Sequence, residues 1–364
     1  MAYTTIDDPS AHHQVLLYTG NATGRSLTNT GNSDLQPDLV VVKDRSATND
    51  WKVTDSSRLG GGSGPTRTLE FNTTGAEYDD QGEGSDATTS FNSDGFTIGT
   101  NGNYNTNNNN YAAWQWKSNG GSTTTNDASS TGVGSQDSVY QANTTSRFSI
   151  VTYGPLGSGG TIAHGLGVVP STIWVKSRTG NRNWCVYHHK LTAAPETDFL
   201  SLDQNVATQD ATVWNDTAPT STVFSVSGDG KVGTDETYVA YCFADVKGYC
   251  KFGSYVGNAS SEGPFVYTGF RPKTVLVKNT ATTNSWNLMD SSRGGPNTMD
   301  HAIYTNSNSA DSADIANWEI DFFSTGFKIR AHEGEMNGDG NSIIYMAWAE
   351  FPFVDSDGAP GTAR

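Results

Sequence analysis

Two similar stretches of the sequence place an acid, two hydroxyls and a base close together. One reads "WKVTDSSR" and contains Asp55 and Arg58, and the other reads "WNLMDSSR" and contains Asp290 and Arg293. Such groups could belong to an active site. They could equally form a structural corner, in which the Asp carboxylate accepts backbone amides and the Arg reaches back as a charged partner.

A third copy of this region favours the structural corner. It reads "WCVYHHK", where Trp184 is kept and His188 and His189 follow in place of the acid and the base. Chemistry shared by all copies would need the same groups in each. We therefore expect Trp51, Trp184 and Trp286 to be core anchors, and the two Asp–Arg pairs to brace a corner.

Other polar clusters give weaker signals. Adjacent residues such as His188 and His189 face opposite sides of a strand, and a metal site needs further ligands. Glu319 and Asp321 are two apart and share a strand face, as the acid and nucleophile of sandwich glycosidases do. The third carboxylate usual in such enzymes is missing, which favours an exposed strand face. No catalytic, cofactor-binding or metal-binding residue is predicted.

Five landmarks occur three times in the same order, which indicates an internal repeat. One is an apolar strand that ends in Lys43, Lys176 or Lys278, with a Trp eight residues later in each copy. The landmarks divide the chain into an N-terminal arm (1–14), a first unit (15–117), a Ser/Thr/Gly/Asn-rich linker or extended arm (118–146), a second unit (147–250), a third unit (251–354) and a C-terminal tail (355–364).

Composition and patterning predict the fold of each unit. Leu is scarce while Gly, Asn, Ser and Thr are plentiful, which opposes a helical protein. Segments such as "YAAWQWK" alternate with a period of two and lie between turn-forming residues. We predict an all-β protein of three tandem antiparallel β-sandwiches, jelly-roll-like or lectin-like.

Charge and hydropathy exclude some classes of partner. The formal net charge is -16, from 22 basic and 38 acidic residues, with no basic run. Nucleic-acid binding is therefore not expected. The sequence has no apolar run that could span a membrane and no signal peptide, so we expect synthesis in the cytoplasm and no membrane insertion. The three cysteines form no CxxC pair and indicate buried free thiols.

The repeat landmarks resemble a known family. The pattern "YTGN … QPDLVxxKxR … W … DSxRG … SFNSDGFTxG … YxAWxWK" is similar to a repeated domain of unknown function in virion proteins of tailed phages that infect marine bacteria. Both ends, "MAYTTIDDPSAHHQVLLYTGN" and "YMAWAEFPFVDSDGAPGTAR", and "TIAHGLGVVPSTIWVKSR" in the middle are also similar. The resemblance covers nearly the whole chain and carries no catalytic motif.

The resemblance implies a lectin-like β-sandwich protein of the phage particle. We expect a virion structural protein, foremost a tail fibre or spike that contributes to host attachment. Its partners are expected to be other virion proteins, two further copies in a homotrimer, and a host-surface glycan or protein. One alternative is a capsid decoration protein of the same fold. A remote alternative is a polysaccharide-degrading enzyme that uses Glu319 and Asp321.

Overall fold

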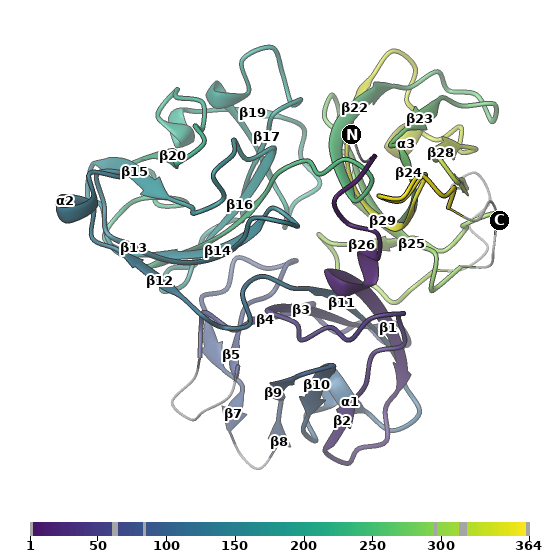
Figure 1. The fold of residues 1–364 in the computed structure, drawn as a ribbon, viewed down its shortest axis with the longest axis horizontal. Helices are drawn as coiled ribbons and strands as arrows, with labels where there is room; N and C mark the ends of the chain where they lie inside the picture. Colours follow the sequence, from purple (N-terminus) through teal and green to yellow (C-terminus); the bar gives the residue numbers. More distant parts are fainter. Residues whose placement is uncertain (1–2, 60–64, 83–84, 295–296, 313–318, 362–364) are drawn as a thin grey trace.

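The fold is all-β and antiparallel, as predicted. The computed structural model describes residues 3–59, 65–82, 85–294, 297–312 and 319–361 (Figure 1). In these ranges every paired strand runs antiparallel to its neighbour. The described α-helices are single turns: α1 (Gly102–Asn105), α2 (Ala128–Thr131) and α3 (Gly334–Asn337).

One strand order occurs in three sheets, which we call the inner sheets. The first unit contains β1 (His13–Thr19), β11 (Asn110–Trp116), β3 (Leu39–Asp44) and β4 (Lys52–Asp55) in that order. The second unit has β14 (Phe148–Tyr153), β21 (Tyr238–Phe243), β16 (Thr172–Ser177) and β17 (Cys185–His188). The third has β22 (Cys250–Val256), β29 (Ser342–Pro352), β24 (Phe270–Asn279) and β25 (Trp286–Asp290). In each, the last long strand of the unit lies between the first strand and the strand that carries the repeated Lys.

A smaller outer sheet accompanies each inner sheet. These are β2 (Arg25–Leu27), β10 (Gly95–Ile98) and β9 (Thr88–Asn92) in the first unit, β15 (Gly159–Ala163) and β20 (Val223–Ser227) in the second, and β23 (Phe265–Tyr267), β28 (Gly326–Ile329) and β27 (Ile320–Phe323) in the third. Short strands complete the edges: β18 (Asp198–Ser201), β19 (Gln209–Asp210) and β26 (Ile303–Tyr304), with β5 (Arg67–Thr68), β6 (Tyr78–Asp79), β7 (Gln81–Gly82) and β8 (Ser85–Asp86) in two ribbons.

Each inner sheet is buried on both faces. In β3, Val40 and Val42 pack into a core shared with the outer sheet of the first unit. The alternate residues Leu39 and Val41 face the other way, into a core that contains residues of all three units. The period of two along a strand explains this division. The three units therefore surround one central core, and Figure 1 shows them as a triangle, with the first unit in purple and blue below the other two.

The predicted linker (118–146) is instead part of the second unit. It contains β12 (Thr124–Asn126), α2 and β13 (Ser138–Asn143), and β13 pairs with β14 along its whole length. Composition was misleading because polar strands near a sheet edge, such as β12 and β13, are held by backbone hydrogen bonds and need few large apolar residues. The side chain of Gln141 also donates to the hydroxyls of Ser56 and Ser57, both at 2.7 Å, and so fastens β13 to the first unit.

The N-terminal arm packs against the units and meets the C-terminal tail. In the N-terminal arm, Ile6 is buried, and His13 already begins β1. The Tyr3 hydroxyl donates to the Gly269 carbonyl of the third unit at 2.8 Å. The Asp7 carboxylate accepts hydrogen bonds from Ser356, so the two tails meet.

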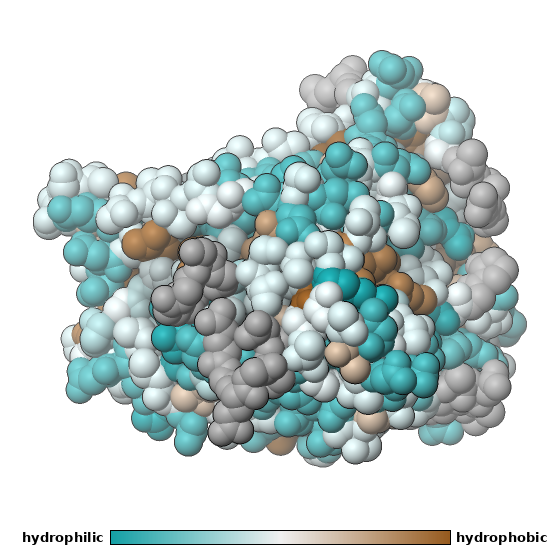
Figure 2. Space-filling model, turned by 90° about the horizontal axis from the view of Figure 1, so that it is seen from below, coloured by the Kyte–Doolittle hydropathy of each residue, from teal (hydrophilic) through white to brown (hydrophobic). Residues whose placement is uncertain are grey.

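The surface shown in Figure 2 is mostly hydrophilic or neutral, and its hydrophobic residues form small separate groups. Within the described residues, no helix has the length and apolar character that crossing a membrane requires.

Candidate functional site

The repeated tryptophans join the units. Trp51, Trp184 and Trp286 are fully buried, and the Nε1–H of each donates to a backbone carbonyl of another unit. The acceptors are Tyr304 at 2.9 Å, Glu70 at 2.7 Å and Ser201 at 2.9 Å, respectively. The first unit thus binds the third, the third binds the second and the second binds the first, which closes a ring. We call the three contacts between units the seams.

The repeated lysines follow the same cycle. Their Nζ groups donate to another unit as follows: Lys43 to the carbonyl of Asn308 at 3.1 Å, Lys176 to that of Thr74 at 2.9 Å, and Lys278 to that of Asn205 at 3.3 Å. Burial lowers the pKa of each lysine to about 8. The sequence marked these residues as landmarks of the repeat, but a role in joining units was not predicted.

The two Asp–Arg pairs form buried braces. Asp55 Oδ2 lies 2.6 Å from Arg58 Nε, and the same distance separates Asp290 Oδ2 from Arg293 Nε. Burial acts to raise the pKa of Asp290, but the charge and hydrogen bonds of Arg293 outweigh it and the pKa is lowered. A carboxylate held in this way is a poor proton acceptor for catalysis.

Each brace also continues into a seam, which the sequence did not predict. Arg58 Nη1 binds Glu77 at 2.9 Å, and Glu77 in turn binds Arg178 of the second unit at 2.9 Å. The equivalent chain in the third unit runs from Arg293 through Asp311 to Arg45 of the first unit, at 3.0 and 2.7 Å. A single carboxylate therefore bridges two arginines in two of the three seams.

In the remaining seam, between the second and third units, other residues occupy the positions of the brace Asp and Arg. His188 occupies the place of the brace Asp, and its Nε2 lies 3.3 Å from the Tyr345 carbonyl oxygen of the third unit. His189 Nε2 lies 2.9 Å from the Phe252 carbonyl oxygen of the same unit. Leu191 is buried at the position of the brace Arg. Burial lowers the pKa of His188 to about 3, so His188 contributes a neutral hydrogen bond at the position where the other two units carry a charged Asp.

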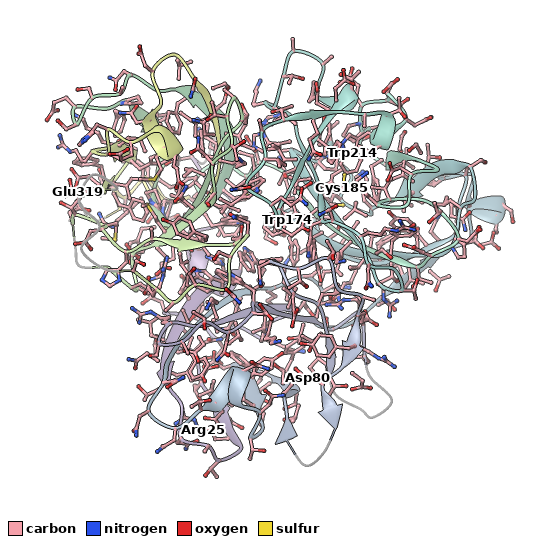
Figure 3. The ribbon with its side chains drawn as sticks, turned by 180° about the vertical axis from the view of Figure 1, so that it is seen from behind. Arg25, Asp80, Trp174, Cys185, Trp214 and Glu319 are labelled. Atoms are coloured by element: carbon pink, nitrogen blue, oxygen red, sulfur yellow. The ribbon has the colours of Figure 1, made fainter. Side chains whose placement is uncertain are left out.

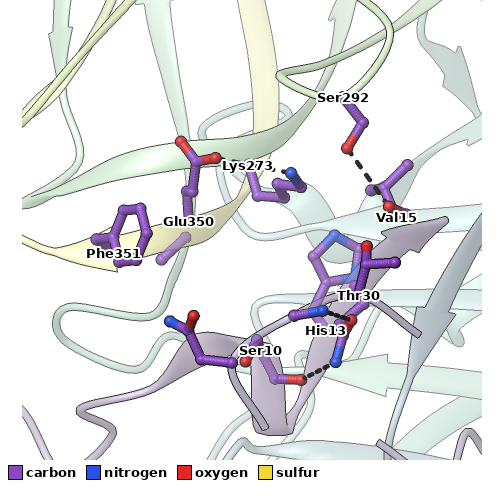
Figure 4. Close-up of a pocket in the computed structure, with 12 residues that line it drawn as sticks. Ser10, His13, Val15, Thr30, Lys273, Ser292, Glu350 and Phe351 are labelled. Carbon is purple, nitrogen blue, oxygen red and sulfur yellow. Dashed lines mark hydrogen bonds and ion pairs between the residues drawn. The ribbon is translucent and has the colours of Figure 1, made fainter. Parts of the chain in front are cut away.

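A cleft of about 210 Å³ opens at the seam between the first and third units (Figure 4). Its lining includes Ser10, His13, Thr30, Lys273, Ser292 and Glu350. Both ring nitrogens of His13 are engaged, Nδ1 with the Gln115 carbonyl oxygen at 2.9 Å and Nε2 with the Thr274 hydroxyl at 2.8 Å. Burial lowers the pKa of His13 to about 3. The cleft offers polar contacts but no histidine ready for proton transfer.

The carboxylates Glu319 and Asp321 do not form a matched pair. Asp321 lies in β27, is only 9% exposed, and accepts a hydrogen bond from Arg330 Nε at 2.7 Å. Glu319 precedes the strand, at the outer side of the third unit (Figure 3). The expectation that both share an exposed strand face is therefore wrong, because an ion pair covers Asp321.

The remaining predictions concern the cysteines and metal binding. Cys185, Cys242 and Cys250 are free and buried, which confirms the prediction. In the part of the chain that the structure describes, no group of three or more His, Cys, Asp or Glu side chains could hold a metal ion.

Comparison with known proteins identifies a family. Residues 8–352 match the family described as a domain of unknown function, DUF7483, and this range extends across all three units. No curated protein and no solved structure matches the chain significantly. The chain therefore belongs to the DUF7483 family.

Proposed function

We propose that the protein is a structural component of a phage particle, a tail fibre or spike that contributes to host attachment. The sequence resemblance to virion proteins, which extends from one end of the chain to the other, supports this proposal. In such a role the protein is a rigid scaffold that presents loops, and no catalytic group is required.

The observation that carries a scaffold role is the use of the repeated polar groups. The repeated indoles and lysines donate hydrogen bonds to a neighbouring unit. The Arg of each Asp–Arg brace binds a carboxylate that forms an ion pair with a neighbouring unit. Buried polar groups used in this way fix one arrangement of the units, because leaving any of them unpaired is unfavourable.

Purified phage particles provide the test. Antibody labelling in the electron microscope is expected to place the protein on the tail, and mass spectrometry is expected to find it in the particle. Absence of the protein from particles that contain the other virion proteins would overturn the proposal.

The threefold arrangement of the units favours a second candidate, a capsid decoration protein. One chain with three similar units has the symmetry needed to sit on a threefold axis of a particle. Copy number separates the candidates, since tens to hundreds of copies per particle indicate the capsid and fewer indicate the tail.

The proposed homotrimer is tested by light scattering, which should give about three times the chain mass of 38.9 kDa.

A further inference from the structure

The outer sheet of the third unit carries a row of exposed aromatic side chains. Phe265 and Tyr267 are alternate residues of β23 and point outward, with 49% and 53% of their surfaces exposed. Phe323 of β27 contacts Phe265 edge to face, with ring centroids 6.0 Å apart. Exposed aromatic rings are unfavourable in water, so their presence needs a reason.

The other two units show that the fold does not require these aromatics. Val266 of β23 is equivalent in position to Leu27 in the first unit and Ile162 in the second. Each of these three residues pairs with a Phe on the neighbouring strand of its outer sheet. The residues that flank Val266 are Phe265 and Tyr267. Those that flank Leu27 and Ile162 are Ser26 with Thr28 and Thr161 with Ala163. The same sheet is therefore built twice with small or polar residues at the positions that are aromatic in the third unit.

The aromatic row continues through Tyr3 into a groove. The hydroxyls of Tyr3 and Tyr267 lie 3.3 Å apart, and the Tyr3 ring contacts Phe353 edge to face at 6.3 Å. The groove has a volume of about 460 Å³ and lies between the N-terminal arm and the second unit. Besides Tyr3, its lining includes the hydroxyl-bearing Thr4, Thr5, Thr144 and Thr145 and the basic Arg147 and Lys247.

The groove is basic although the protein is acidic. The described lining residues carry two cations and no carboxylate, in a chain of net charge -16. Lys247 Nζ lies 4.2 Å from the centroid of the Tyr3 ring, and Lys251 Nζ lies 5.4 Å from that of Tyr267. Cations beside both rings favour a ligand that is itself anionic.

We propose that this aromatic row and the groove beside it bind an acidic saccharide. The apolar faces of the sugar rings stack on Phe265 and Tyr267, the carboxylate or sulfate groups bind Lys247 and Arg147, and the threonine hydroxyls bind sugar hydroxyls. The exposed area of Phe265 and Tyr267 is roughly 200 Å², well below the ~800 Å² per partner of a stable protein interface. The inference rests on the proposed function in host attachment and names the chemistry of the receptor.

The test measures binding of the full chain to soluble polysaccharides by calorimetry and affinity electrophoresis. The probes are a polyuronate, a sulfated polysaccharide and a neutral dextran. We expect wild type to bind one or both anionic polymers and not dextran. The double variant Phe265→Ser with Tyr267→Thr installs the residues of the first unit, so it should fold and bind at least tenfold more weakly. Lys247→Gln should also weaken binding, and added salt should have less effect on this variant than on wild type.

Val169→Thr is the matched control, because Val169 is 52% exposed in the second unit and outside the site. It should bind as wild type does. The inference is overturned if wild type binds neither anionic polymer, if the double variant binds them as well as wild type does, or if the same surface is covered by an acidic protein that saccharide does not displace. Particle labelling is a separate measurement. A protein present on particles that binds no saccharide contradicts this inference alone, and a saccharide-binding protein absent from particles contradicts the proposed function alone.

Discussion

At the scale of single residues, the three buried lysines make the stability of the protein depend on pH. Lys43, Lys176 and Lys278 end apolar strands, yet each places its ammonium group against backbone carbonyls at a seam. Burial lowers the pKa of all three to about 8. In the unfolded chain a lysine has a pKa of about 10.4. Between these values the unfolded state binds more protons than the folded state, so these lysines make stability rise as the pH rises through this window.

Replacing Lys176 with Met tests this coupling. The carbonyls of Thr74 and Arg182 lose their donor, so the free energy of unfolding should fall by about 1–3 kcal/mol at pH 10, where wild type no longer buries a charged lysine at this site. The increase in stability from pH 8 to pH 10 should also be smaller than in wild type. Urea unfolding across this range measures both effects, and Lys190→Met, at an exposed site, is the control that should change neither. An unchanged slope in Lys176→Met would show that this lysine is not the source.

The buried braces permit a direct comparison of charged and neutral versions of one corner. Arg293→Leu leaves the buried carboxylate of Asp290 without its partner, so it should destabilise the protein by about 3–5 kcal/mol. Adding Asp290→His installs the residues that the second unit has, as His188 and Leu191, and should recover part of this loss. A double-mutant cycle from urea unfolding measures the coupling. Strictly additive losses would mean that the pair does not act as a unit.

At the scale of elements, the repeated strands were predictable and their surroundings were not. The runs that end in Lys43, Lys176 and Lys278 are apolar on both strand faces, a pattern typical of a strand covered on two sides. Such a pattern indicates a second covering layer over each inner sheet, besides its outer sheet. It could not show that the layer comes from the other two units, because periodicity records which faces are buried and not what covers them. The seam partners, such as Glu77 and Asp311, lie in loops without periodicity.

The strand β13 is the element on which composition and structure differ most. Its backbone pairs with β14 from Ser138 to Asn143, so these amides should exchange slowly with deuterium. A flexible linker would exchange them within seconds. Hydrogen exchange followed by mass spectrometry distinguishes the two outcomes, and the exposed bend at 192–194 serves as the internal reference for rapid exchange. Gln141→Ala should speed exchange in β13, since it removes the contacts with Ser56 and Ser57.

At the scale of the whole molecule, three similar seams differ in charge. All three share a backbone hydrogen bond, donated by Glu77 to Arg178, by Thr208 to Thr280 and by Asp311 to Arg45, at 2.8, 3.0 and 3.0 Å. Two of these pairs are also ion pairs, whereas the pair of threonines is neutral. The backbone hydrogen bond is therefore common to all three seams, and ion pairs between side chains strengthen two of them.

Because the three units form a closed ring, the chain could begin at a different seam and still form the same contacts. The tails meet where Asp7 binds Ser356, so a short Gly/Ser linker can join them. New ends between the exposed Ser122 and Thr123 separate the first unit from the second without cutting a strand of an inner sheet. This circular permutant should fold with all seams intact, with near-ultraviolet circular dichroism like that of wild type and a similar midpoint of urea unfolding.

The contrasting chain is the first unit alone, residues 15–117. It exposes one face of its inner sheet, where Val41, Trp51 and Trp114 pack against the other units in the full protein. It should therefore lack a cooperative unfolding transition, because a small domain cannot leave that much apolar surface in water. If this fragment unfolds cooperatively and the permutant does not fold, the units are independent sandwiches and the seams are secondary. If the permutant folds and the fragment does not, the ring is the unit of stability, and a change at one seam should lower the stability of all three units together.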